Sequence, residues 1–381
     1  MNLHILDDEK FFDPFVQKLE ALGLLGNNIF VVKECGSLKY IKRQDLIYCR
    51  MCDSRRIGNT RHYAKVFIHC FTRDLFEWVY DNDFQELNWI IWGKDLYLTE
   101  DLFEKQTKHI VKKIKDRRSA IELRLTRARH FFLNIDLSKV YTKVANVLTW
   151  IKPEYDYAVT HIKGLKANHL DFAYMFEYDA EFIVSQFLYN RNFKHKKISD
   201  FKIVLGNSGV ASNNHLDALE ELRQLGFEEI VIPLSYGNEK YIKILQKEIE
   251  RKPLLTKITY LTQFLTLHEY LTAFYKSDIF VSNSIRPLGM GNIWIALLLG
   301  KLVFMNPKNL VFDFLKSMGL QVFAIGELES VEDIAQTIDV KANVDIAIDF
   351  LSTARIDAMY RNLFSATVRN TSELHLCTST L

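Results

Sequence analysis

The sequence is poor in the residues that break or cross-link a chain. It has 6 Pro and 15 Gly among 381 residues and a hydrophobic fraction of 48%, which excludes a disordered or collagen-like chain. Its five cysteines form no even-numbered framework, which excludes a disulfide-rich scaffold and fits a reducing compartment. No apolar run reaches the roughly 18 residues of a spanning helix, and the first residues, MNLHILDDEK, do not resemble a signal peptide. We therefore expect a well-packed cytoplasmic protein that meets a membrane only at its surface.

Charge is nearly balanced, and its small excess is unevenly distributed. The formal net charge is +2; Lys and Arg outnumber Asp and Glu in residues 1–200, and the reverse holds afterwards. Residues 103–130, FEKQTKHIVKKIKDRRSAIELRLTRARH, predict a long basic helix. Its basic side either faces water or contacts anionic lipid headgroups or a lipid-linked diphosphate. A net charge of +2 is a poor basis for binding a nucleic-acid backbone, so we expect no nucleic acid partner.

Short apolar runs alternate with helical patterns along the whole chain. In the first half, strands are expected at 3–6, 29–32, 65–69 and 87–92, with a further one at 157–160. In the second half, they are expected at 202–206, 229–233, 257–260, 278–282 and 301–305. This alternation predicts an α/β fold with two doubly wound parallel sheets, split by a polar linker at 192–199. The predicted domains are 1–192 and 200–381, facing across a cleft, with the last helices free to pack back on the first domain.

The stretch from 201 to 226 combines a strand, a polar loop and a helix. An apolar run ends at Gly206, a loop of Gly, Ser and Asn follows, and apolar residues then recur at Leu216, Leu219 and Leu222. A helix N-terminus presents free N–H groups and the positive end of its dipole to one spot, which suits an anion. The loop lacks the Gly spacing of a dinucleotide fingerprint and the Lys of a P-loop. We expect it to contact a nucleotide ligand with neutral polar groups.

Ligands of open parallel sheets bind beyond the carboxyl ends of the strands, so the residues after each strand are the candidate site. These are Gly206, Asn207, Ser208, Asn213, Asn214, His215, Tyr236, Asn238, Asn283, Arg286, Gly289, Gly291 and Asn292. Gly291 and Asn292 open a predicted helix, 293–299, whose backbone donors could hold a diphosphate together with Arg286. The alternative is that the glycines only let the strand turn tightly into the helix.

Simpler roles are open for several of these residues. Ser212 or Asn213 could be the N-cap of the following helix. His215 could make a structural hydrogen bond instead of contacting a phosphate or a sugar hydroxyl. Tyr236 could stack on a base, bind a phosphate or simply anchor its loop.

Several linked motifs resemble one known family. GNSG followed by SNNH, then PLSYGN, and then Arg-x-x-Gly-x-Gly-Asn-Ile resemble glycosyltransferase family 56, the Fuc4NAc transferases of enterobacterial common antigen and O-antigen synthesis. The resemblance is strongest over 202–300 and weaker around His4, Asp8 and 92–97. It implies a metal-independent hexosyltransferase of GT-B fold that binds dTDP-Fuc4NAc on the C-terminal domain. It also implies an acceptor saccharide linked to undecaprenyl diphosphate, bound by the N-terminal domain at the inner face of the plasma membrane.

Glycosyl transfer also needs a base for the acceptor hydroxyl proton. Asp8, directly after the first strand, is the first candidate and Asp7 the second, although Asp8 could instead cap the helix that starts near Phe11. Lys94 and Asp95 follow the fourth predicted strand and are candidate acceptor contacts, although WGKD could equally be a turn.

Two motifs suggest a metal but lack supporting ligands. Cys49 and Cys52 form a single CxxC, whereas a closed zinc site needs two further ligands. Asp81-Asn-Asp83 fits a DxD pattern for a divalent cation, but it lies in the basic half, far from the nucleotide-like motifs. We expect ordinary thiols, a surface turn, no metal and no cofactor.

Two alternatives stay open at the level of sequence. A GT-B transferase could use another nucleotide sugar and another acceptor, because few pocket residues decide the sugar. A non-catalytic membrane-surface protein of a glycan assembly complex could keep the fold and lose the reaction. The presence of Asn207, Arg286, Gly289 and Gly291 argues against a decayed site.

Overall fold

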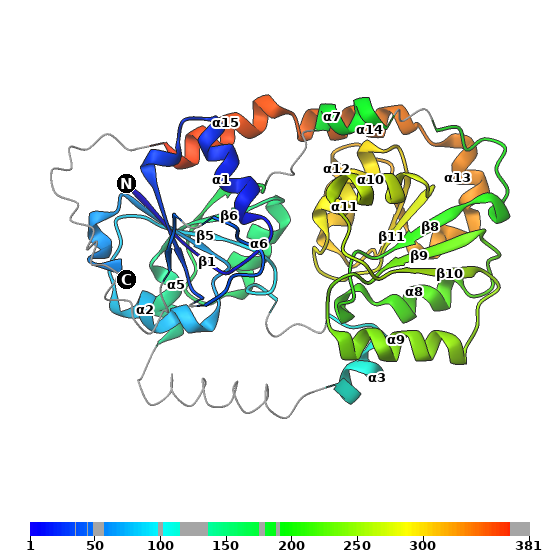
Figure 1. Ribbon diagram of the computed structural model, residues 1–381, viewed down its shortest axis with the longest axis horizontal. Coiled ribbons are helices and arrows are strands. Elements are labelled where there is room, and N and C mark those ends of the chain that lie inside the picture. The colour runs from blue at the N-terminus through cyan, green and yellow to red at the C-terminus, as the bar shows by residue number, and fades with distance from the viewer. Residues whose placement is uncertain are drawn as a thin grey trace. The chain divides into compact units, whose positions relative to one another are not determined.

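The computed structural model describes residues 1–34, 36–43, 45–48, 57–97, 102–114, 136–174, 180–187 and 191–365. The chain forms two compact units, which are described separately (Figure 1). Unit 1 consists of Met1–Leu98, Ile121–Phe176 and Ala354–Leu381, and unit 2 of Thr99–Ala120 and Glu177–Thr353. The cysteines at 49 and 52 lie outside the described residues.

Unit 1 is built on a seven-stranded, fully parallel sheet. Its strands are β1 (Asn2–Leu6), β2 (Asn28–Val32), β3 (Ile47–Tyr48), β4 (Lys65–His69), β5 (Leu87–Ile90), β6 (Val144–Thr149) and β7 (Asn168–Asp171), in the order β3-β2-β1-β4-β5-β6-β7. The order reverses between β1 and β4, so their carboxyl ends form the topological switch point at which such sheets bind ligands.

Helices cover both faces of this sheet (Figure 1). They are α1 (Phe12–Ala21), α2 (Phe76–Asp81), α5 (Leu137–Thr142), α6 (Lys152–His161) and α15 (Thr353–Phe364). Helix α15 returns from the end of the chain and buries Ile356, Tyr360 and Phe364 in one core with Phe15 of α1. Its apolar face thus completes the first core with residues more than 300 positions away from β1.

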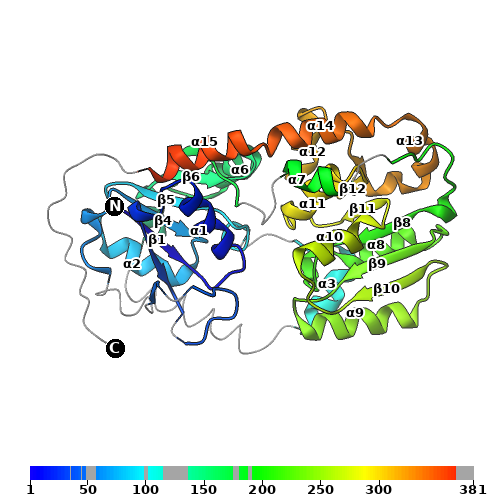
Figure 2. The ribbon, with the colours of Figure 1, turned by 45° about the horizontal axis from the view of Figure 1, so that its top comes forward.

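Unit 2 has a six-stranded parallel sheet in the order β10-β9-β8-β11-β12-β13, which Figure 2 shows from β8 to β12. The strands are β8 (Lys202–Leu205), β9 (Glu229–Pro233), β10 (Lys257–Leu261), β11 (Ile279–Ser282), β12 (Leu302–Met305) and β13 (Phe323–Ala324). The central strands are buried on both faces, as their nearly continuous apolar sequences require. The switch point lies between β8 and β11. Both units have the two-faced, Rossmann-like topology predicted from the sequence.

The helices of unit 2 also lie on both sides of its sheet (Figure 1). They are α3 (Lys105–Ile114), α7 (Ala180–Gln186), α8 (His215–Leu222), α9 (Glu239–Arg251), α10 (Leu267–Tyr275), α11 (Met290–Leu298), α12 (Leu310–Ser317), α13 (Val331–Thr337) and α14 (Val340–Phe350). Residues 293–298 of α11 are all buried, so the position of this helix is fixed by packing on all sides.

Helix α3, the start of the predicted basic helix, packs on α8 and α9 of unit 2 (Figures 1 and 2). Asp217 of α8 accepts hydrogen bonds from the backbone N–H of Gln106 (2.7 Å) and from the N–H and hydroxyl of Thr107 (3.0 and 2.7 Å). A carboxylate at a helix N-terminus satisfies its free donors and complements its dipole. Ile110 adds an apolar anchor in the core of unit 2. Part of the basic stretch predicted at 103–130 therefore belongs to unit 2, and its residues 115–130 lie outside the described part.

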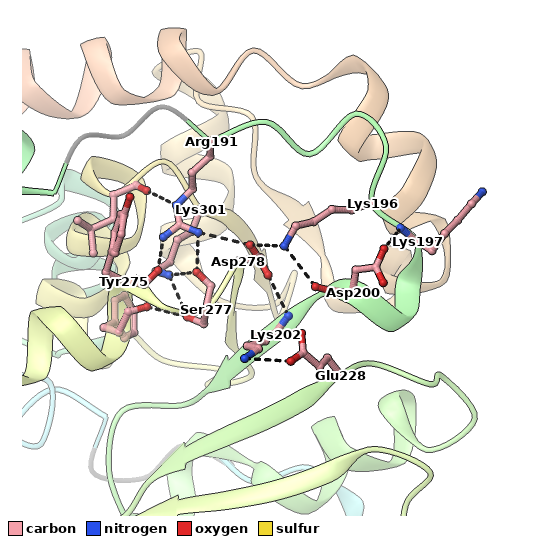
Figure 3. Close-up of polar contacts among 12 residues, drawn as sticks. Arg191, Lys196, Lys197, Asp200, Lys202, Glu228, Tyr275, Ser277, Asp278 and Lys301 are labelled. Atoms are coloured by element: carbon pink, nitrogen blue, oxygen red, sulfur yellow. Dashed lines mark hydrogen bonds and ion pairs between the residues drawn. The ribbon is translucent and has the colours of Figure 1, made fainter.

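The segment that leads into β8 is fixed at the amino-terminal edge of the second sheet (Figure 3). The Arg191 guanidinium donates to the backbone carbonyls of Ser277 (2.7 Å), Leu299 (2.8 Å) and Tyr275. These carbonyls lie at the C-terminal ends of α10 and α11, where a cation is favourable. Lys301, buried beside them, donates to the Ser277 hydroxyl at 2.9 Å.

Two predictions about chain organisation are wrong. Residues 157–160 are helical, within α6, although their sequence YAVT favours a strand; Pro153 in the first turn starts a helix whose register includes them. The linker predicted at 192–199 is held against unit 2, and the division between the units falls at 176–177, because Arg191 anchors the following segment.

Candidate functional site

Two loops meet at the switch point of the second sheet. One joins β8 to α8 and the other joins β11 to α11. Asn214 donates its side-chain amide to the carbonyl of Asn283 (3.1 Å), and Asn283 donates to the carbonyl of Asn214 (3.2 Å). Both asparagines are buried. This reciprocal pair fixes the two loops side by side, so these residues hold the site together.

The N-terminus of α11 opens at this junction. Its N-cap is Gly289, with φ of +64°, and the first hydrogen bonds of the helix are donated by Asn292 (2.8 Å) and Ile293 (3.2 Å) to the Gly289 carbonyl. The backbone N–H groups of Met290 and Gly291 precede these bonds, as expected for the first turn of a helix. Free N–H groups at a helix N-terminus can bind an anion, and the anion site predicted from the sequence at this helix stays a prediction.

Asn207 lies against the start of α11. A Cβ added at Gly289 would be 2.9 Å from the Asn207 Cγ, so the two residues are in direct contact. The Asn207 amide nitrogen faces the Tyr236 hydroxyl at 3.4 Å, which leaves Oδ1 as the free end of the amide. This Oδ1 is buried and has no hydrogen-bond partner within the described residues. An unsatisfied acceptor beside an anion site suits a ligand that carries a hydroxyl next to its phosphates.

His215, in the first turn of α8, lies under the β8 loop. It is fully buried, and burial lowers its pKa to about 3, so the imidazole is neutral. Nδ1 lies 3.0 Å from the Tyr241 hydroxyl, and Nε2 has no partner among the described residues. A Cβ at Gly206, whose φ is +71°, would be 2.7 Å from this Nε2. The His215 ring therefore packs against Gly206 and supports the loop that joins β8 to α8.

Other predicted ligand contacts are used to shape the loops. Asn213 donates to the Ser208 carbonyl (2.8 Å), and both residues are buried. Asn238 is the N-cap of α9, its side chain accepting from the Tyr241 N–H (3.0 Å). Asn213 and Ser208 thus bond to each other inside the protein, while Asn238 is exposed and uses its side-chain oxygen as a helix cap. Contact of these three residues with a donor stays a prediction. The predicted N-cap of α8 is also wrong: it is Asn214, in a left-handed conformation.

Among the described residues of unit 2, we consider Asn207, Tyr236, Arg286 and the first turn of α11 as the candidate ligand contacts. The Arg286 backbone carbonyl accepts from Ser284 (2.9 Å) and Asn309 (3.0 Å), which fixes this loop immediately before α11. The site thus combines one guanidinium with a helix N-terminus and neutral polar groups.

Sequence reasoning missed three residues of this edge. Asn306 and Asn309 follow β12; Asn306 donates to the Asn283 side chain (3.0 Å) and Asn309 to the Ser284 carbonyl (2.8 Å). The rule that selected the other post-strand residues could have found them. Tyr270 of α10 has a buried hydroxyl without a partner among the described residues, and burial raises its pKa. No sequence pattern marked it.

The carboxyl edge of the first sheet contains the predicted acceptor-side residues. The carboxylate of Asp8 accepts from the backbone N–H groups of Lys39 (2.6 Å), Tyr40 (3.1 Å) and Ile41 (2.9 Å). It thereby holds the loop after β2. Asp8 does not cap α1, whose N-cap is Phe11 without a side-chain bond.

Asp7 and Lys94 form part of an ion-pair cluster at the same edge. The Asp7 carboxylate oxygens lie 2.7 Å from Lys33 Nζ and 3.1 Å from Lys94 Nζ, and Lys94 Nζ also lies 3.6 Å from a carboxylate oxygen of Glu9. Partial burial raises the pKa of Glu9. Lys94 is 46% exposed, so it remains available to a ligand.

Asp95 cannot act as predicted. It is 1% exposed, and its oxygens accept from the Phe71 N–H (2.8 Å), the Trp89 indole (2.7 Å) and the Trp92 N–H (3.0 Å). Its burial raises the pKa of its carboxyl group. An acceptor cannot reach it, and we assign it a structural role.

No described residues form a group of three or more His, Cys, Asp or Glu side chains able to hold a metal ion. Asp83 of the DxD pattern pairs with Arg61 on the surface and follows α2.

Comparison with known proteins finds a family whose model matches just under half of the chain. Residues 178–367 match the family described as 4-alpha-L-fucosyltransferase glycosyl transferase group 56. No curated protein matches the sequence.

Solved structures show the fold at low identity. HepE of Anabaena in complex with UDP-glucose is 13% identical over 95% of this chain and 99% of its own, with a TM-score of 0.59. The trehalose 6-phosphate synthase of Burkholderia multivorans is 9% identical over 95% of both chains, with a TM-score of 0.55. WaaG, a glycosyltransferase involved in lipopolysaccharide biosynthesis, is 8% identical over 95% and 98%, with a TM-score of 0.52. The two Rossmann-like units are those of the GT-B fold, as predicted.

Proposed function

We propose that this chain, a glycosyltransferase of group 56 through its residues 178–367, transfers a 4-acetamido-4,6-dideoxyhexose such as Fuc4NAc from a dTDP-sugar to a saccharide on undecaprenyl diphosphate. The reaction would serve the synthesis of a bacterial surface polysaccharide such as enterobacterial common antigen or O-antigen. The enzyme class follows from the family. The donor, the acceptor and the place of the reaction are proposals, supported by the motifs at 206–215, 233–238 and 286–293.

The observation that carries the proposal is the pairing of the α11 N-terminus with the free Oδ1 of Asn207. The helix offers N–H groups to a diphosphate, and Oδ1 needs a hydroxyl donor beside it. A nucleotide sugar presents both groups on one molecule. The charge that develops on the departing diphosphate would be stabilised by this helix and by Arg286.

Two comparisons support the donor class. The family description names fucosyl transfer, and fucose is a 6-deoxyhexose, as is Fuc4NAc. HepE was crystallised with UDP and with UDP-glucose. The choice of thymidine over uridine rests on the motif resemblance.

The acceptor hydroxyl needs a base at the carboxyl edge of the first sheet. Both predicted candidates have partners: the oxygens of Asp7 form ion pairs with Lys33 and Lys94, and those of Asp8 accept three backbone N–H groups that hold a loop. Asp7 gives the clearer test, because its substitution leaves that loop anchored. Asp7→Asn should abolish transfer and leave nucleotide affinity unchanged, measured by product formation and by nucleotide titration. Transfer by Asp7→Asn at the wild-type rate would exclude this base. Loss of transfer in Asp8→Asn carries less information, since the loop at 39–41 would lose its anchor.

Contact with an anionic membrane at the inner face of the plasma membrane is proposed for the basic stretch that begins in α3. No helix among the described residues is long and apolar enough to cross a membrane. Neutralising Lys112, Lys113, Arg117 and Arg118 should abolish flotation with anionic vesicles. The matched control neutralises Lys139, Lys152, Lys163 and Lys166 of unit 1, and equal flotation of both variants would defeat the proposal.

The donor proposal is tested by thermal unfolding with dTDP, UDP, GDP and ADP. A nucleotide at 100 times its Kd adds about 2.7 kcal/mol to the free energy of unfolding. We expect dTDP to stabilise most, followed by transfer from dTDP-Fuc4NAc without added metal. Stabilisation by another nucleotide would change the donor, and stabilisation by none would defeat the proposal. Activity that disappears with a chelator and returns with Mg²⁺ or Mn²⁺ would show that the enzyme needs a metal.

A further inference from the structure

Three aromatic rings, none of them among the predicted site residues, gather at the carboxyl edge of the first sheet. Phe11 is the N-cap of α1, Trp92 follows β5 by two residues, and Tyr174 follows β7 by three. The Trp92 and Tyr174 ring centroids are 5.5 Å apart at 88°, and Phe11 lies 6.0 Å from Tyr174 and 6.4 Å from Trp92. Phe11 is 39% exposed, and the other two rings are half-buried. We call these residues the aromatic platform.

The polar atoms of the platform are hydrogen-bonded to each other and to the interior. The Trp92 indole N–H donates to the Tyr174 oxygen at 2.9 Å, and the Tyr174 hydroxyl bonds to His69 Nδ1. His69 Nε2 lies 2.9 Å from His4 Nδ1, and His4 Nε2 lies 2.9 Å from Asn28 Oδ1. The chain of bonds thus runs from the edge of the sheet into its centre.

The direction of every bond in this chain is determined. The Asn28 amide nitrogen donates to backbone carbonyls, so its Oδ1 can only accept. His4 must therefore donate from Nε2 and accept at Nδ1, and His69 must do the same. Burial lowers the pKa of both histidines, that of His4 to about 4, which keeps both neutral. Tyr174 is left to donate to His69 and to accept from Trp92, in a single fixed orientation.

Because the polar atoms of Trp92 and Tyr174 are already hydrogen-bonded, the platform offers a ligand mainly the apolar surface of its rings. Burying His4 and His69 among phenylalanine rings has a desolvation cost, which the hydrogen bonds of this chain compensate. The same hydrogen bonds hold the Trp92 and Tyr174 rings rigid. Rigid aromatic groups lose little entropy on binding, which suits a ligand contact.

Lys94, which lies beside the platform, is already paired. The Lys94 ammonium lies 5.6 Å from the Trp92 ring centroid and forms ion pairs with Asp7 and Glu9. Compensated charge favours a neutral ligand over a strong anion or cation. Paired carboxylates and ammonium groups can still bond to hydroxyls, and aromatic faces attract the C–H groups of a ligand. A saccharide ring offers one face of C–H groups and a rim of hydroxyls.

We propose that Phe11, Trp92 and Tyr174 form the subsite for a neutral sugar ring of the acceptor saccharide. The inference rests on the proposed function, in that the acceptor binds to unit 1. It places the sugar at the carboxyl ends of β1, β5 and β7, beside Asp7 and Lys94. His4 and His69 are positioning residues, because they act on the sugar only by orienting Tyr174.

The test measures sugar binding directly, without the transfer reaction. Saturation-transfer NMR on the full chain uses the methyl glycosides of glucose, galactose, mannose and N-acetylglucosamine as probes. We expect at least one to bind to the wild-type protein and its affinity to fall about fivefold in Phe11→Leu. The control is Phe84→Leu, a half-buried Phe at the amino end of β5 that contacts Trp78, and its affinity should not change.

Each unfavourable result counts against the subsite. Binding of none of the glycosides to the wild-type protein overturns it, as does unchanged affinity in Phe11→Leu. Trp92→Phe, which keeps a ring and removes the donor to Tyr174, serves as the second variant and should weaken binding less than Trp92→Leu. Equal losses in Phe11→Leu and Phe84→Leu would mean that general destabilisation is the cause, and would also refute the subsite.

The result is separable from the donor proposal. Nucleotide titrations on the same samples report on unit 2, so glycoside binding without nucleotide binding would defeat the donor proposal and keep the subsite. Nucleotide binding without glycoside binding would do the opposite. In a transfer assay, Phe11→Leu should raise the KM for the acceptor severalfold with kcat unchanged.

Discussion

Replacing Gly289 by alanine isolates the contact between the α11 N-terminus and Asn207. Gly289 has a φ of +64°, and its new Cβ would be 2.9 Å from Asn207 Cγ and 3.1 Å from Nδ2. The left-handed conformation costs a residue with a Cβ roughly 1–2 kcal/mol. Relief of the close contact then requires Asn207 to move away from the helix. The substitution should therefore damage both stability and the ligand site.

Gly319→Ala is a matched control for the backbone strain. Gly319 has a φ of +88°, and its added Cβ would approach only Ile346 Cδ1, at an ordinary distance of 3.6 Å. We expect each substitution to lower the free energy of unfolding by about 1–2 kcal/mol. Only Gly289→Ala should weaken nucleotide binding, by about tenfold, because losing the hydrogen bond of Asn207 and shifting the helix N-terminus together cost on the order of 1–1.5 kcal/mol.

Two measurements separate these effects. Denaturant unfolding gives the loss of stability, and calorimetric titration of the folded protein with its preferred nucleotide gives the affinity. Equal affinities of Gly289→Ala and the wild-type protein would refute the assignment of the α11 N-terminus as the diphosphate site. Equal losses of affinity in both variants would show that strain anywhere in unit 2 is sufficient, which would refute the role of Asn207.

The remaining predictions concern the contacts that hold the units in shape. Asp217→Ala should release the N-terminus of α3 at a cost of about 1 kcal/mol, seen as faster hydrogen exchange at 105–114 with unchanged exchange in β8. Arg191→Met should cost about 2–3 kcal/mol in urea unfolding, since it removes the donor of the Tyr275 and Leu299 carbonyls and one of the two donors of the Ser277 carbonyl. Lys301→Met should leave the free energy of unfolding at pH 7 nearly unchanged or raise it. Burial lowers the pKa of Lys301 well below its ordinary value, so below pH 10.5 the unfolded chain binds this proton more readily than the folded chain does. A decrease in the free energy of unfolding as large as that in Arg191→Met would contradict this. The free energy of unfolding should fall as the pH is lowered from 6.5 to about 4, since His4 is protonated in the unfolded chain and not in the folded one. If a His4→Gln variant loses stability over this pH range as the wild-type protein does, His4 is not the cause.

Most of the strands could be predicted because parallel strands buried on both faces are apolar throughout. The run at 278–282 corresponds to β11 and that at 301–305 to β12. Strands β3, β6, β7 and β13 were missed. Strands β3 and β13 have two residues each, and β7, NHLD, has hardly any apolar residues, but β6, VANVLT, was missed although it is largely apolar. The assignment of α3 to unit 2 could not be predicted, since it depends on Asp217, which binds helix donors 110 positions earlier in the chain.

The structure brings the predicted loops of unit 2 together at one edge of the sheet, and it shows contacts for several of their residues that the sequence did not indicate. The rule that ligands bind after the strands selected Asn207 and Asn238 alike. Only the structure shows that Asn238 caps α9 whereas Asn207 keeps an acceptor free. Both are asparagines after strands, and which polar atoms are already satisfied depends on neighbours that lie far away in the sequence.

The prevalence of asparagine at this edge has a physical reason. An asparagine side chain both donates and accepts without carrying charge, so Asn214, Asn283 and Asn306 can link three loops into one network without adding a field of their own. Under the proposed function, carboxylates in their place would repel a diphosphate at the α11 N-terminus, and ammonium groups would bind it elsewhere. With a neutral network, the helix dipole and Arg286 would determine where a bound diphosphate lies. Rigid loops and localised positive potential are what a transferase needs to stabilise the leaving group at one position.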